Sequence, residues 1–152
     1  MKTIFLKKSL LMASILAAAG YAGFASAHTA GGVIDAAGNN ASATDFASVS
    51  CFDDGSGAPD YLFIQIQDRS APVQGLLMTM LAAKGNQMVS TSDPVSGDPN
   101  PGPGVKLRGG DGTYYIAALK TAAGARTFTV SYHCMTSNDN HTGTDITALQ
   151  LQ

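Results

Sequence analysis

Residues 126–134 read RTFTVSYHC, and the alternation within this stretch decides the fold. Apolar side chains occupy every second position and end at Cys134, while threonine, serine and His133 fill the positions between them. A period of two is typical of a β-strand that buries one face and exposes the other. We therefore expect Cys134 to face a hydrophobic core and His133 to face away from it.

Other segments show the same kind of pattern. Residues 61–67 (YLFIQIQ) alternate cleanly and follow a turn-forming cluster, DDGSGAPD. We expect further strands at 44–52, 87–91, 105–108, 113–120 and 144–152, whereas 73–83 fits either a buried strand or a short helix. Seven or eight short strands separated by turns predict an all-β fold, an antiparallel β-sandwich of jelly-roll or immunoglobulin-like type.

The chain has two cysteines, Cys51 and Cys134, so only one disulfide can form within it. Both lie near the ends of expected strands. In an oxidising compartment an even number of cysteines indicates a disulfide. We expect this bond to join the two packed sheets.

The first 27 residues have the features of a secretory signal peptide. Lysines come first, an apolar run follows, and Ala25-Ser26-Ala27 supplies the small residues that a signal peptidase recognises. Cleavage after Ala27 predicts an exported protein, periplasmic or extracellular, that begins at His28. The apolar run is short for a membrane span, and we expect no membrane segment after its removal. Residues 28–43 are then expected to form an extended arm, and residues 44–152 the β-sandwich domain.

Charge limits the classes of partner. The formal net charge is −2, and loss of the three leader lysines makes it −5. Such a chain has no basic patch to displace counterions from a phosphate backbone. We therefore expect neither nucleic acid nor an anionic membrane surface as a partner.

Three segments together resemble bacterial pre-peptidase C-terminal β-sandwich domains. They are DYLFIQI (60–66), GDGTYYIAAL (110–119) and ARTFTVSY (125–132). The resemblance covers about residues 60–134 and implies a jelly-roll-like binding or accessory module rather than a catalyst. The disulfide and the segment 135–152 depart from that family's pattern.

The histidines give the sharpest chemical hypothesis. An amino-terminal His28 would offer a metal both its amine and its ring, and His133 and His141 are the remaining imidazoles of the chain. A planar or T-shaped set of nitrogens suits Cu(II). The terminal position of His28 resembles the histidine brace of secreted copper proteins. We expect Tyr114 and Tyr115 to be ordinary sheet residues.

Calcium is a second metal hypothesis, based on carboxylates. Aspartates gather in two turn-rich stretches: Asp53, Asp54 and Asp60 in the first, Asp93 and Asp98 in the second. Hard cations prefer such oxygen ligands, but the spacing of a dedicated calcium loop is missing, and aspartate in turns commonly bonds its own backbone.

Two classes of function follow. The first is an exported binding protein that binds Cu(II). The second is a surface or extracellular structural subunit, which would assemble when the arm and the tail 144–152 each add a strand to the sheet of a neighbouring copy. No common catalytic motif is present in the sequence, so an enzyme is the less favoured interpretation.

Overall fold

The computed structural model describes residues 28–152, and the expected leader at 1–27 lies outside the described residues. Nine strands and no helix occur in the described part of the chain. The strands are β1 (Thr29–Ile34), β2 (Thr44–Phe52), β3 (Tyr61–Asp68), β4 (Met78–Lys84), β5 (Gln87–Ser92), β6 (Val105–Arg108), β7 (Gly112–Lys120), β8 (Arg126–Met135) and β9 (Gly143–Gln150).

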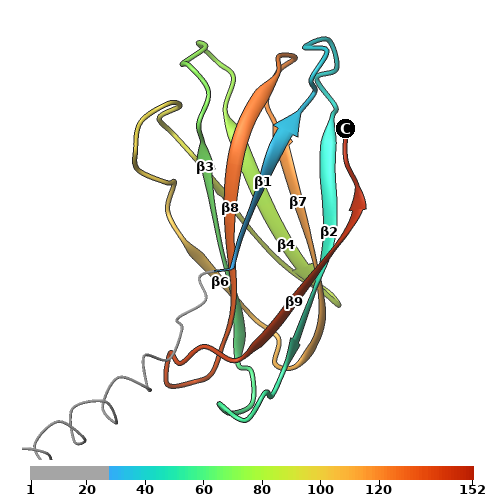
Figure 1. Ribbon diagram of the computed structural model, residues 1–152, viewed down its shortest axis with the longest axis vertical. Coiled ribbons are helices and arrows are strands. Elements are labelled where there is room, and N and C mark those ends of the chain that lie inside the picture. Colours follow the sequence, from blue (N-terminus) through green and yellow to red (C-terminus); the bar gives the residue numbers. More distant parts are fainter. Residues whose placement is uncertain (1–27) are drawn as a thin grey trace, which may run out of the picture.

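The strands form two antiparallel sheets that pack as two layers (Figure 1). One sheet has the order β1-β8-β3-β6 and the other β5-β4-β7-β2-β9. Alternate side chains of both sheets fill one core, which contains Leu62, Ile64 and Ile66 of β3 together with Met78 and Met80 of β4. The predicted all-β sandwich is confirmed.

The ambiguous segment 73–83 contributes β4, whose side chains alternate between buried and partly exposed positions. Period two therefore describes residues 78–83, while residues 73–77 precede the strand. A strand is favoured here because β4 lies between β5 and β7 and bonds to both.

The segment 28–43, expected as an extended arm, instead places residues 29–34 in a sheet. β1 pairs with β8 in register from Thr29↔Ser131 to Ile34↔Arg126. This strand makes the count nine, one above the expected maximum. β1 and β9 are edge strands of their sheets, and self-association through such edges stays a prediction.

The disulfide joins Cys51 of β2 to Cys134 of β8. Their Cα atoms are 5.4 Å apart, and their sequence separation is 83. Since β2 and β8 belong to different sheets, the bond crosses the core as expected. A disulfide is compatible with an exported, oxidising compartment, and none of residues 28–152 forms a helix able to span a bilayer.

Two buried ion pairs lie at the end of the sandwich opposite the disulfide. Lys120, at the end of β7, contacts the carboxylate of Asp35 at 2.7 Å, and Arg126, at the start of β8, contacts Asp68 at 2.6 Å. All four side chains are almost fully buried. The turn between β7 and β8 is therefore held on both sides by paired charges.

Candidate metal centre

The structure brings His28, His133 and His141 together. The ring centroids of His133 and His141 are 4.4 Å apart, and that of His28 lies 6.2 Å and 5.6 Å from them. One ring nitrogen of each residue lies within 4.8 Å of the corresponding atoms of the other two. Among residues 28–152 this is the only group of three or more His, Cys, Asp or Glu side chains close enough to share one ion.

His133 is held by the central part of its sheet. It lies on β8 opposite Phe63 of β3, and the two rings stack with centroids 6.0 Å apart. Its neighbour Cys134 is fixed by the disulfide. The backbone of His133 is therefore constrained by both the strand pairing and the covalent bond.

His28 is anchored by the same strand. Its carbonyl oxygen accepts a hydrogen bond of 3.1 Å from the backbone N–H of Tyr132. This bond continues the β1–β8 register by one residue, and the His28 and Tyr132 rings lie 5.9 Å apart. His28 is consequently hydrogen-bonded to the sheet, directly before the first residue of β1.

His141 reaches the site from the connection between β8 and β9. It forms an isolated bridge with Met135, and Thr142 donates its N–H to the carbonyl of Cys134. The Thr142 hydroxyl donates to carbonyl oxygens of the neighbouring connection, at Phe52 and Gly57. These bonds fix the loop on which His141 sits.

The surroundings of His133 and His141 favour the neutral form of these two rings. Burial, together with the nearby His141 and His28, lowers the pKa of His133 to about 4. Burial also lowers the pKa of His141, with a contribution from His28, while the charge of Asp54 opposes this shift. A neutral imidazole keeps the lone pair that a metal needs.

Two ring nitrogens of the site have no hydrogen-bond partner. The Nδ1 atoms of His28 and His133 are buried and unsatisfied among the described residues. A buried polar atom without a partner costs free energy. A metal ion bound at these nitrogens would satisfy both of them.

The aspartates considered for calcium form hydrogen bonds or ion pairs within the protein. Asp53 and Asp54 accept backbone N–H groups of their own turn, and Asp98 does the same for Asn100. Asp60 pairs with Arg108, and the buried Asp93 accepts the N–H of Asp68. Among residues 28–152, no three of these carboxylates lie close enough to share one ion.

Tyr132 is the neighbour of the site that sequence reasoning missed. Tyr114 and Tyr115 lie elsewhere: the Tyr114 hydroxyl donates to Gly110, and the Tyr115 ring stacks on Phe46. Tyr132 lies on the core face of β8, as the alternation predicts. Only the pairing of β1 with β8 brings His28 next to it, and no local sequence pattern records that pairing.

Comparisons of this chain with protein-family models, with curated proteins and with solved structures find no match.

Proposed function

We propose that the chain is an exported Cu(II)-binding protein whose ligands are His28, His133 and His141. The convergence of the three rings carries this proposal, because they come from separate places: His28 directly precedes β1, His133 lies on β8, and His141 lies in the connection between β8 and β9. The two unsatisfied Nδ1 atoms support it.

The donor set favours copper over other divalent ions. Cleavage after Ala27 would give residue 28 a free amine in addition to its ring, and the site would then consist of nitrogens only. Divalent copper has the highest affinity for nitrogen sites in the first-row series and prefers a tetragonal arrangement. Both cysteines are bonded to each other, so no thiolate competes for a softer metal.

The position of residue 28 supports an amine ligand. A loose arm would lose conformational entropy on docking to a metal. Here the His28 carbonyl already accepts a hydrogen bond from the Tyr132 N–H, and the residues after His28 form β1, which pairs with β8. The backbone nitrogen of the same residue is therefore close to its final position before any metal binds.

The decisive experiment uses protein purified after export, with its amino terminus located by intact mass. We expect one equivalent of Cu(II) to bind, more tightly than Zn(II), in a calorimetric titration with a competing chelator. A variant with one extra residue ahead of His28 should lose most of this affinity, because its amine moves away from the ring. Undiminished affinity in that variant would reject the amine ligand.

The ring ligands have a matched control. His133→Ala should weaken Cu(II) binding by more than about 100-fold, since even the outer partners of metal ligands are worth 10–100-fold. Ser131→Ala changes the same face of β8 two residues earlier and should bind Cu(II) like the wild type. Equal affinities of the two variants would remove His133 from the site.

A further inference from the structure

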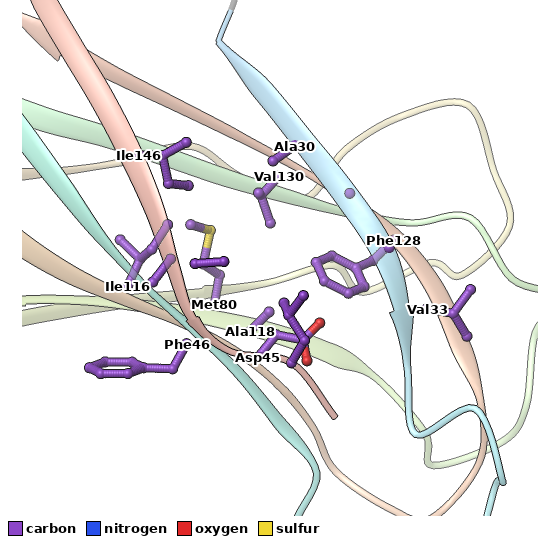
Figure 2. Close-up of a pocket in the computed structure, with 15 residues that line it drawn as sticks. Ala30, Val33, Asp45, Phe46, Met80, Ile116, Ala118, Phe128, Val130 and Ile146 are labelled. Atoms are coloured by element: carbon purple, nitrogen blue, oxygen red, sulfur yellow. The ribbon is translucent and has the colours of Figure 1, made fainter.

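We propose that a cleft between β1 and β9 binds a small apolar molecule that carries a protonated amine. β1 and β9 are the edge strands on the same side of the two sheets. Between them the sandwich opens into a cleft of about 200 Å³. Figure 2 shows side chains of both sheets turned into this space.

The interior of the cleft is apolar. Met80, Ile116 and Ala118 line it from one sheet and Phe128 and Val130 from the other, with Ile146 near the opening. A cavity of about 150 Å³ with such a lining stays dry and binds benzene. The present cleft therefore fits a molecule somewhat larger than benzene, and burial of its apolar surface would favour binding.

Among residues 28–152, Asp45 is the one charged residue that lines the cleft. Figure 2 shows its carboxylate directed across the opening toward β1. One of its oxygens accepts the backbone N–H of Gln152 at 2.8 Å. No lysine or arginine of residues 28–152 forms an ion pair with it, and burial raises its pKa. A bound ammonium group would complement this unpaired charge.

The chain itself does not fill the space. An added Cβ at Gly32 would meet no atom within 4 Å, so β1 leaves room on the side of the cleft. Leu151, which lies at the rim, is 74% exposed rather than inserted. The cleft is thus an open site, and the last residues of the chain border it.

Three probes of one shape test the proposal: phenethylamine, phenethyl alcohol and phenylacetate. Titration by calorimetry and NMR should show the amine binding at least about tenfold more tightly than the alcohol, because a hydrogen bond to a charged group exceeds a neutral one by about that factor. The anion should bind most weakly. Amides of β1 and β9 should shift. All titrations use metal-free His133→Ala protein as well as wild type, because amines also coordinate copper.

Three variants locate the site. Asp45→Asn keeps an acceptor for Gln152 but should abolish the preference for the amine over the alcohol. Ala148→Leu narrows the cleft and should lower the affinity for both at least about tenfold. Thr147→Leu, the adjacent exposed residue on β9, should leave both affinities unchanged. Circular dichroism confirms that each variant is folded.

Equal binding of amine and alcohol by the wild type, or unchanged amine binding by Ala148→Leu, would overturn the proposal. Neither result depends on copper, so failure here leaves the histidine site untouched. Conversely, loss of copper binding in His133→Ala should not change the affinity for phenethylamine.

Discussion

Gly31 allows β1, the strand that follows His28, to lie close to β8. A Cβ added there would lie 2.5 Å from the carbonyl oxygen of Phe128 on β8, which is too close for a real contact. At the adjacent Gly32 the same atom would meet nothing. The close approach of β1 to β8 therefore requires glycine at one of these positions and not at the other.

This difference gives a prediction for a matched pair of substitutions. Gly31→Ala should push β1 away from β8, destabilise the protein by about 1–3 kcal/mol as overpacking does, and weaken Cu(II) binding about tenfold. Gly32→Ala should change stability by no more than about 0.5 kcal/mol, as at an ordinary surface position, with unchanged copper affinity. Urea unfolding and copper titration measure both. Wild-type affinity in Gly31→Ala would show that the close approach does not position His28.

At this scale the sequence predicted the candidates for the site but not their arrangement. His28, His133 and His141 are its only imidazoles, and their chemistry indicates a nitrogen site. Alternation placed His133 on the outer face of its strand. That His28 lies beside it depends on the β1–β8 register, a tertiary interaction that residue types do not specify.

Among the elements, β8 connects the core to the candidate metal centre. It pairs with β1 and β3, carries His133, and supplies Cys134 to the disulfide. Met135 at its end bridges to His141. A displacement of the end of β8 would therefore move two of the three histidines.

Removal of the disulfide tests this connection. Cys51→Ser combined with Cys134→Ser opens a link that spans 83 residues and should lower the free energy of unfolding by about 4 kcal/mol in the chain-entropy model. We also expect weaker Cu(II) binding, because the end of β8 is no longer tied to β2. Chemical unfolding and copper titration of the folded fraction measure the two effects. Wild-type copper affinity would show that strand pairing alone holds the histidines.

The sequence predicted the long alternating strands well and the short or irregular ones less well. Burial on one face imposes period two on β3 and β8, so their patterns are unambiguous. β1 has only a few apolar residues around two glycines, and it is a strand because it pairs with the edge of β8. In β4, runs of apolar residues satisfy both helical and strand spacing, and the neighbouring strands decide between them.

For the whole molecule, the buried pair of Asp35 and Lys120 predicts sensitivity to acid. The ion pair, together with backbone hydrogen bonds, holds the pKa of Asp35 well below its ordinary value of 3.8. The unfolded chain therefore binds a proton at this carboxyl more readily than the folded protein does, and the free energy of unfolding falls as the pH drops below about 4.

The matched variant is Asp35→Asn, which keeps a residue type that tolerates the positive φ of this position. Its stability should be lower than that of the wild type at neutral pH and should change less between about pH 4 and pH 2. Asp45→Asn should steepen the acid loss instead, because burial raises the pKa of Asp45 and a proton there favours the folded state. Urea unfolding midpoints measured across this pH range test both predicted changes. If the midpoint fell with pH equally in the wild type and in Asp35→Asn, Asp35 would not be the source of the acid sensitivity.

The two ends of the sandwich are closed by different chemistry. At one end a covalent sulfur bridge ties β2 to β8 next to the histidines, and at the other end ionic contacts hold the turn between β7 and β8. A reductant should therefore destabilise the end of the sandwich that holds the disulfide, and acid should destabilise the end that holds the ion pairs. Hydrogen exchange followed under each condition should show opening that begins at opposite ends of β8, near Cys134 with the reductant and near Arg126 with acid.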